Sequence, residues 1–336
     1  MSSDLLRQVE HGAAQILAWL IDPFVQFLFR DSLLWWPFLL SAFAVALAGF
    51  WATHGRDAAA FVEFRRRFLG RALWAHRSAQ ADYAYYIVNT LIYPLIVAPL
   101  VISSAAFARL IESGLARLAG PMGAPLLGIG WTRALYTVLF YLAYDWGRFA
   151  AHSLLHEAPL LWQFHKVHHS AEVLTPITSF RTHPVELFVM AVIPNAATGL
   201  VSGIVWYLSA GEVGFYTFLG LHVVMAATGA IGNLRHWQVW ISFGPVLNRW
   251  LISPAHHQIH HSRELRHFGM NRGFELAIWD RLAGTLYVPG AEEKFAMGLG
   301  DGSDGAWHRV ARLYAWPFRY ALELLGVGSK PALPER

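Results

Sequence analysis

The stretch LLWWPFLLSAFAVALAGFWA (residues 33–52) decides the class of fold, because it runs for twenty residues without a charged side chain. An α-helix rises about 1.5 Å per residue, so about twenty apolar residues cross the ~30 Å hydrocarbon core of a bilayer. The whole chain agrees: 55% of its 336 residues are hydrophobic and only 14% are charged, about half the charged share of a soluble domain. The sequence predicts an all-α integral membrane protein.

Further apolar segments predict about four core transmembrane helices. Residues 84–108 form a second uncharged span, and residues 132–150 begin apolar and end polar, as expected of a helix that emerges into water. Residues 186–208 and 213–231 are predicted as two more segments, either full spans or a short hairpin that returns to the same side, because Pro194, Gly199 and Gly203 interrupt the first of them. Residues 12–29 are interrupted by Asp22 and Pro23, so an extra N-terminal span or an interfacial helix is expected there.

Charge sets the predicted orientation. Loop 53–83 holds six arginines and loop 109–131 only two, so the positive-inside rule places the first loop in the cytoplasm. Counting spans forward brings every histidine-rich segment to the same cytoplasmic side. An arginine- and alanine-rich, lysine-poor composition favours a bacterial inner membrane. No basic, aromatic-interleaved domain indicates a nucleic-acid partner.

Histidines gather in three short segments: HSLLH (152–156), HKVHHS (165–170) and HHQIHH (256–261). Within each segment they recur at i, i+3 or i+4, which places their side chains on one face of a helix. This rhythm selects His257 over His256 in the third segment. The residues chosen by it are His152, His156, His165, His168, His169, His257, His260 and His261.

Eight imidazoles in this arrangement predict a metal site. Burying them without partners costs several kcal/mol, and eight ligands are too many for one four-coordinate ion but enough for two. The chain has no cysteine, and imidazole suits iron, zinc, copper and nickel alike, so the ligands leave the metal open. A histidine-rich two-metal site beside lipid favours oxidation of a C–H bond over hydrolysis, and no HExxH metalloprotease motif is present.

These segments resemble the fatty acid hydroxylase/sterol desaturase superfamily of membrane di-iron oxygenases, whose boxes read HxxxH, HxxHH and, after a hydrophobic hairpin, HxxHH. Members also carry a histidine about twenty residues before the third box, a place that His236 holds. The resemblance covers residues 84–290, with residues 1–83 as N-terminal membrane segments and a basic loop, and residues 291–336 as a C-terminal cytoplasmic tail. The flanks that match are LLWQFHKVHHS (160–170), RTHPVE (181–186), ISPAHHQIHHS (252–262) and NRGFELAIWDRLAGTLYVP (271–289).

The resemblance implies a cytoplasmic helical cap in which these nine histidines hold two iron ions. Such a centre uses O2 and electrons from a separate donor (a ferredoxin, a cytochrome b5-like protein or a reductase) to hydroxylate or desaturate a lipid. A fatty acyl chain, ether lipid, sterol, hopanoid or carotenoid is each a possible substrate. The alternative is a membrane metal-binding or transport protein without oxygenase activity, which needs polar residues through the spans; residues 33–52 and 84–108 contain no Asp, Glu, Lys, Arg or His.

Metal-bound histidines need acceptors that fix the tautomer of the outer ring nitrogen. Asp145 and Asp280 are the candidates, with a purely fold-stabilising role as the alternative for both. Arg148 and Arg181 are expected to be solvated or to extend toward the interface, with pairing to a carboxylate or a lipid phosphate as the alternative. Lower-ranked residues of the site are His183, His222, His256 and Asn271.

Overall fold

The computed structural model describes residues 3–327, and their regular structure is almost entirely helical. Within that range the only strands are β1 (Thr217–Phe218) and β2 (Leu221–His222), which pair antiparallel. Three helical stretches are long and apolar enough to cross a membrane: Trp36–His54, Arg77–Ala119 and Pro184–Leu208. The prediction of an all-α membrane protein is confirmed.

The predicted spans correspond to α2 (Trp36–His54), α5 (Arg77–Ile96) with α6 (Ser104–Ala119), α7 (Ile129–Glu157) and α9 (Pro184–Leu208). The segment 84–108 is not one straight helix, because the chain leaves α5 through the short 3-10 helix η2 (Ala98–Leu100), where Pro99 stands at the start. Helix α7 extends two turns past the predicted end, and these turns carry the HSLLH segment.

Of the two alternatives for residues 213–231, a full span or part of a short returning hairpin, the full span is wrong. These residues form the β1–β2 hairpin and then α10 (Val223–Gly232), which has ten residues and rises only about 15 Å. The hairpin turns at Leu219 and Gly220, whose φ angles are 53° and 79°. This left-handed backbone suits glycine and interrupts a helix, so apolar composition alone did not make a span.

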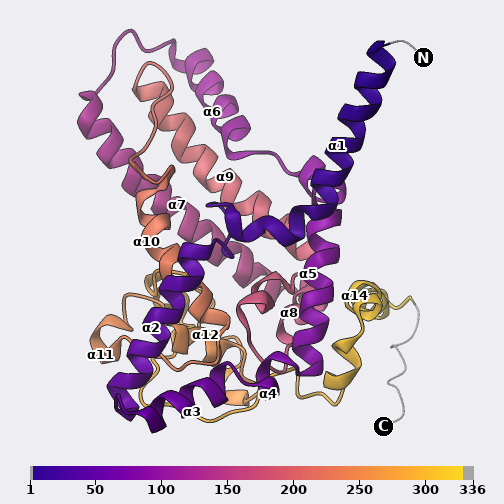
Figure 1. The fold of residues 1–336 in the computed structure, drawn as a ribbon. Helices are drawn as coiled ribbons and strands as arrows, with labels where there is room; N and C mark the ends of the chain where they lie inside the picture. Colours follow the sequence, from indigo (N-terminus) through magenta and orange to yellow (C-terminus); the bar gives the residue numbers. More distant parts are fainter. Residues whose placement is uncertain (1–2, 328–336) are drawn as a thin grey trace.

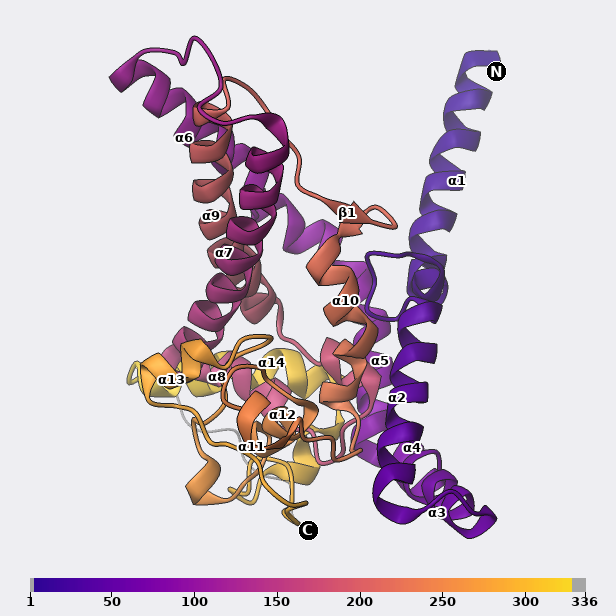
Figure 2. The same cartoon turned by 90° about the vertical axis from the view of Figure 1, so that its left-hand side faces the viewer.

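The glycines of α9 mark close helix packing and not interruptions. Helix α9 is continuous through Pro194, and α6, α7 and α9 lie side by side (Figures 1 and 2). A Cβ atom added at Gly199 would lie 2.3 Å from the Cβ atom of Phe107, and one at Gly203 would lie 2.5 Å from the carbonyl oxygen of Ala108. Small residues therefore let the backbones of α6 and α9 meet, a packing mode common in membrane helices.

Helix α1 (Ser3–Val25) contains most of the predicted N-terminal segment, and the C-terminal part of α1 contacts α5 (Figure 1). The indole of Trp19 donates to the carbonyl oxygen of Leu91 at 3.0 Å, and the hydroxyl of Tyr86 donates to that of Pro23 at 2.7 Å. The 3-10 helix η1 (Gln26–Leu28) follows, and the chain then turns into α2.

The remaining helices form a layer at the lower end of α7, which we call the cap (residues 158–183 and 233–327) (Figure 2). The 3-10 helix η6 and α14 belong to the predicted tail, and they pack against α5 and α8. Residues of that tail beyond 327 lie outside the described range. The cap helices are α8 (Pro159–His169), η3 (Pro176–Phe180), η4 (Asn233–His236), α11 (Gly244–Leu247), α12 (Pro254–His260), η5 (Leu265–His267), α13 (Ile278–Ala283), η6 (Asp304–His308) and α14 (Val310–Leu324). Between α2 and α5, the basic loop forms α3 (Ala58–Phe68) and α4 (Arg71–Trp74).

Candidate metal centre

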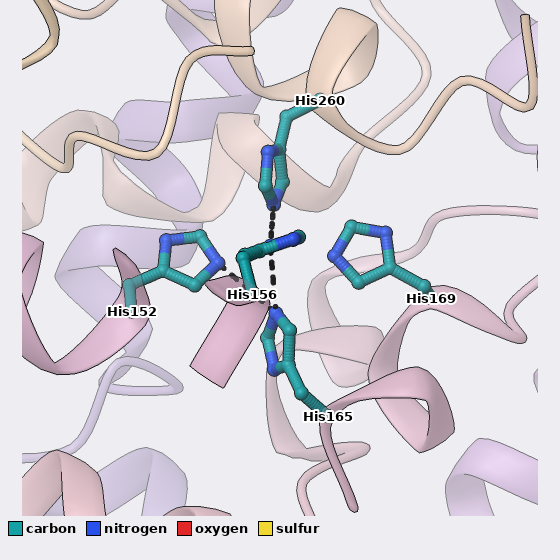
Figure 3. Close-up of side chains that lie close together, drawn as sticks. All are labelled: His152, His156, His165, His169 and His260. Atoms are coloured by element: carbon teal, nitrogen blue, oxygen red, sulfur yellow. Dashed lines mark hydrogen bonds between the residues drawn. The ribbon is translucent and has the colours of Figure 1, made fainter. Parts of the chain in front are cut away.

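The nine histidines singled out from the sequence lie together in two groups, and within each group one ring nitrogen of every member lies within 4.8 Å of those of the others. The first group draws from the end of α7, from α8 and from α12. Figure 3 shows its five rings meeting at one point. The first group is His152, His156, His165, His169 and His260, and the second is His168, His236, His257 and His261.

Helix α8 divides its histidines between the groups because of helical geometry. His165 and His169 are one turn apart and face the first group, while His168 is rotated from His169 by about 100° and faces the second. Helix α12 does the same with His260 on one side and His257 on the other. Both groups therefore share the same two helices and adjoin each other.

In both groups the Nε2 atoms point inward. In the first group the Nε2 atoms of His156 and His260 are 3.2 Å apart, and those of His152 and His165 are 3.1 Å apart. In the second group the Nε2 atom of His257 is 2.8 Å from that of His236.

The outer Nδ1 atoms have acceptors in the protein. The Nδ1 atom of His152 donates to the carbonyl oxygen of Arg272 at 2.7 Å, and that of His260 to the carbonyl oxygen of Met270 at 2.8 Å. A carbonyl oxygen only accepts, so these Nδ1 atoms carry the proton and the inward Nε2 atoms carry lone pairs. Converging lone pairs repel unless a cation lies between them, and the residues present therefore fit a metal ion.

Burial keeps these imidazoles neutral, the form that binds a metal. It lowers the pKa of His168 to about 3 and that of His260 to about 4, from an ordinary value of 6.5. In His168 the positive charge of a protonated neighbour, His260, lowers the pKa further. At neutral pH both rings are free to act as ligands.

The metal-free protein is expected to lose stability as the pH falls from about 6.5 to about 4. The folded-state pKa values of His168 and His260 are lowered, so across this window the unfolded chain binds more protons than the folded one, and protonation favours unfolding. Thermal unfolding in detergent at a series of pH values measures the effect. Bound metal should move the loss to lower pH, because protons must then displace the ion. An unfolding temperature that stays constant from pH 7 to pH 4.5 would contradict the burial of neutral rings.

Three lower-ranked histidines lie outside both groups. His256 is buried, but its Nδ1 atom accepts from the backbone N–H of Ser253 at 3.0 Å and caps α12. His183 and His222 likewise stand before α9 and α10 and accept from backbone N–H groups there. Each ring accepts a hydrogen bond at the start of a helix, and none of the three belongs to either histidine group.

The two carboxylates chosen as partners of the ligands contact no ligand ring among the described residues. Asp145 accepts from the indole of Trp279 at 2.9 Å and from the backbone N–H of Glu275 at 3.0 Å. Asp280 accepts from the backbone N–H of Gly273 at 2.7 Å and so holds the peptide whose carbonyl oxygen, that of Arg272, meets His152. Both carboxylates accept hydrogen bonds from the segment 271–285. Such contacts are what the alternative, a purely fold-stabilising role, predicts.

Asn271 is likewise an internal anchor. Its side-chain amide donates to the carbonyl oxygen of His256 at 3.3 Å and accepts from the backbone N–H of Tyr287 at 2.8 Å. Its φ of 56° is a left-handed conformation that asparagine tolerates well.

The carboxylate that does contact a ligand ring was missed. Glu186 is buried in the first turn of α9, and its Oε1 atom accepts from Nδ1 of His165 at 2.9 Å. In the second group the hydroxyl of Ser179 lies 2.9 Å from Nδ1 of His236. The segment RTHPVE ends in Glu186, so its place in a flank that matches the superfamily was the available signal, but the contact spans 21 residues and has no periodicity.

Replacing Glu186 by alanine is expected to weaken metal binding at the first group about 10- to 100-fold, as for other partners of ligand histidines. The change removes the acceptor that orients His165. Competition with a chelator, followed by metal analysis, measures the affinity. Glu186→Gln is the matched control, because a glutamine side-chain oxygen still accepts from Nδ1 and most of the affinity should remain. Equal losses in both variants would show that charge, and not orientation, is what matters.

The expectation that Arg148 and Arg181 are solvated is wrong for both. Arg181 is fully buried, and its guanidinium donates to Asp82 at 2.7 Å and to the carbonyl oxygen of Val167 at 2.8 Å. The Arg148 side chain is 22% exposed and its guanidinium stacks 3.7 Å above the ring centre of Phe274. Burial is possible for both because each cation meets a carboxylate or an aromatic face.

A cavity of about 560 Å³ adjoins both histidine groups. Much of its wall is apolar and comes from α2, α7, α9 and α10. The histidines that line it are His152, His165, His168, His236 and His257, and its apolar side chains include Leu33, Phe38, Leu187, Met190, Met225 and Phe274.

Comparison with known proteins agrees with this site. Residues 137–285, which contain all nine histidines, match the fatty acid hydroxylase family. The chain is 30% identical over 203 residues to an ornithine lipid hydroxylase of Rhizobium tropici, covering 60% of this chain and 56% of the relative. It is 25% identical over 210 residues to an alkylglycerol monooxygenase of Danio rerio, covering 61% and 42%. A Delta(7)-sterol 5(6)-desaturase of Eremothecium gossypii is 28% identical over 174 residues, covering 51% and 43%.

The matched part spans about half the length of these relatives. No solved structure matches the chain. The family match falls on the same region as the two histidine groups. Residues 137–285 therefore match a fatty acid hydroxylase domain, and this match and the relatives together support the fatty acid hydroxylase/sterol desaturase superfamily.

Proposed function

We propose that this protein is a membrane-bound, di-iron, O2-dependent oxidoreductase that hydroxylates or desaturates a C–H bond of a lipid. The observation that carries the proposal is the pair of histidine groups with inward Nε2 atoms beside a largely apolar cavity. The first group would hold one iron ion and the second group the other. When bound, the two ions would supply the reaction of O2 with a C–H bond that no side chain of this protein can attack alone.

The chain's own residues orient the ligand histidines, accommodate the lipid and exclude water. Contacts from Glu186 and from the carbonyl oxygens of Arg272 and Met270 hold His165, His152 and His260 with Nε2 inward. The apolar cavity wall accommodates hydrocarbon and displaces water from it.

The proposed reaction requires a partner protein that donates electrons. In hydroxylation one oxygen atom of O2 enters the C–H bond and the other leaves as water, which consumes two electrons and two protons. In desaturation two hydrogens leave the lipid and both oxygen atoms leave as water, which consumes two electrons and two protons from the donor as well. The chain has no cysteine for an iron–sulfur cluster, so a separate ferredoxin, cytochrome b5-like protein or reductase is the proposed donor. Six arginines in residues 53–83 support a cap that faces the cytoplasm, where such donors are found, with a bacterial inner membrane as the proposed location.

The test begins with metal analysis of protein purified without oxygen. We expect about two iron ions per chain. Lipid mass spectrometry of cells with and without the protein should then reveal a lipid that gains one oxygen atom or loses two hydrogens. A purified, iron-loaded protein that consumes no O2 with a reduced donor across a broad lipid panel would overturn the proposal and favour a metal-binding or transport role.

A further inference from the structure

Besides Glu186, which is bonded to His165, the cavity wall beside the histidines carries a cluster of three charged side chains: Arg148, Arg235 and Glu275. The Nη2 atom of Arg235 lies 2.6 Å from Oε1 of Glu275, and Nη1 of Arg148 lies 3.9 Å from the same oxygen. Their side chains are 22%, 11% and 13% exposed for Arg148, Arg235 and Glu275. Charges this well covered are costly unless they serve a ligand or a partner.

This cluster adjoins both histidine groups. Phe274 lies between Arg148 and the first group, since its ring centre is 3.7 Å from the guanidinium carbon of Arg148 and 5.3 Å from the ring centre of His152. Arg235 directly precedes His236 of the second group. Whatever contacts the two guanidinium groups therefore also lies next to the place where the C–H bond would react.

Arg148 lacks a hydrogen-bond acceptor. No hydrogen bond among the described residues uses its guanidinium N–H groups, and 3.9 Å to Glu275 is too long for one. The guanidinium is held by stacking on Phe274 and by Tyr144, whose ring centre is 5.4 Å away. Arginine has five N–H donors in a planar fork that suits carboxylate and phosphate. The unused donors of Arg148 indicate an anionic ligand in the cavity.

The other side chains fit the rest of a lipid. Phe38 of α2, Leu187 and Met190 of α9 and Met225 of α10 offer an apolar wall for hydrocarbon. Arg30 and Asp31 also line the cavity, but both are exposed, and Arg30 already donates to the carbonyl oxygen of Leu219 at 3.0 Å. The covered charges lie on the histidine side of the cavity.

We propose that Arg148 and Arg235 bind an anionic group, a carboxylate or a phosphate, in the headgroup of the lipid substrate, with Glu275 holding the two guanidinium groups in place. The oxidised carbon then lies in the headgroup or within a few atoms of it, and the hydrocarbon tails extend along the apolar wall. The place of oxidation rests on the proposed function, whereas binding of the headgroup does not. An uncharged sterol or alkylglycerol would leave Arg148 without an acceptor, a loss that polar sites reject strongly.

Binding of matched lipids to the full-length, metal-loaded protein in neutral detergent tests the proposal. Three probes carry the same acyl chains: an acylated amino acid with a free carboxylate, phosphatidylglycerol and diacylglycerol. Native mass spectrometry measures the affinities. We expect at least one anionic lipid to bind about 10- to 100-fold more tightly than diacylglycerol. Comparing the carboxylate and phosphate probes identifies which anion the site takes.

Variants locate the anion. Arg148→Gln and Arg235→Gln should each lose most of the preference for the anionic lipid, while Arg148→Lys should retain part of it as a point charge. Arg30→Gln and the surface variant Arg266→Gln should keep the preference. Metal content and the unfolding temperature verify that each variant is folded; if Arg148→Gln fails this check, the lysine and Arg235→Gln variants decide.

Equal binding of all three lipids to the unmodified protein would overturn the inference. So would a loss of preference in Arg30→Gln but not in Arg148→Gln, because the headgroup would then lie at the other end of the cavity. Anionic preference without O2 consumption would refute the proposed oxidation alone. Oxidation of uncharged lipids, unchanged in Arg148→Gln, would refute the headgroup site alone.

Discussion

Replacing His257 by asparagine should reduce bound metal from about two ions to about one per chain and lower lipid oxidation by at least about 100-fold. His257 meets its group through Nε2, which lies 2.8 Å from Nε2 of His236. An asparagine amide reaches the position of Nδ1 but not that of Nε2, so it removes this ligand. Metal analysis of the purified variant and product formation from lipid measure the two effects.

His256→Asn is the matched control, since the two histidines are neighbours on α12. His256 uses Nδ1 to accept from the backbone N–H of Ser253, and an asparagine oxygen in the same position preserves that bond. This variant should keep both metal ions and most of the activity. If both variants lost metal equally, the loss would reflect disruption of α12, and the assignment of His257 over His256 would fail.

The histidine groups show what a sequence predicts well. The i, i+3, i+4 rhythm is a local property of a helix, so spacing alone picked out the eight box histidines and ranked His257 above His256, but it did not predict that α8 and α12 each divide their histidines between two groups. The uncharged run of residues 33–52 likewise corresponds to α2, because the length needed to cross a bilayer is set by helix rise alone.

The sequence predictions that failed all depend on contacts between distant segments. Residues 213–231 are as apolar as a span, yet positive φ angles at Leu219 and Gly220 turn them into a hairpin and a short helix. Glu186 becomes the partner of His165 only because the start of α9 packs against α8. Asp145 has the sequence position of such a partner, but it faces the backbone of Glu275 and Leu276. Hydropathy and spacing carry no information about which element lies across from a side chain.

The buried pair of Arg181 and Asp82 gives the largest expected effect on stability. Both side chains are fully buried, and the guanidinium of Arg181 donates 2.7 Å to Asp82 on α5 and 2.8 Å to the hydroxyl of Ser170 after α8. Asp82→Asn leaves a buried cation without its counter-charge, which is expected to cost about 3–5 kcal/mol of unfolding free energy. Denaturation in mixed detergent micelles measures this cost.

The double variant separates the pair from its surroundings. Asp82→Asn with Arg181→Met removes both charges, so its cost should be smaller than the sum of the two single variants. Glu63→Gln is the surface control: it breaks the exposed i, i+3 pair with Arg66 and should leave the unfolding temperature unchanged. Metal binding should weaken in Asp82→Asn, because Arg181 also holds the carbonyl oxygen of Val167, the residue before His168. Additive costs in the double variant would mean that the two residues act independently and that α8 is positioned by other contacts.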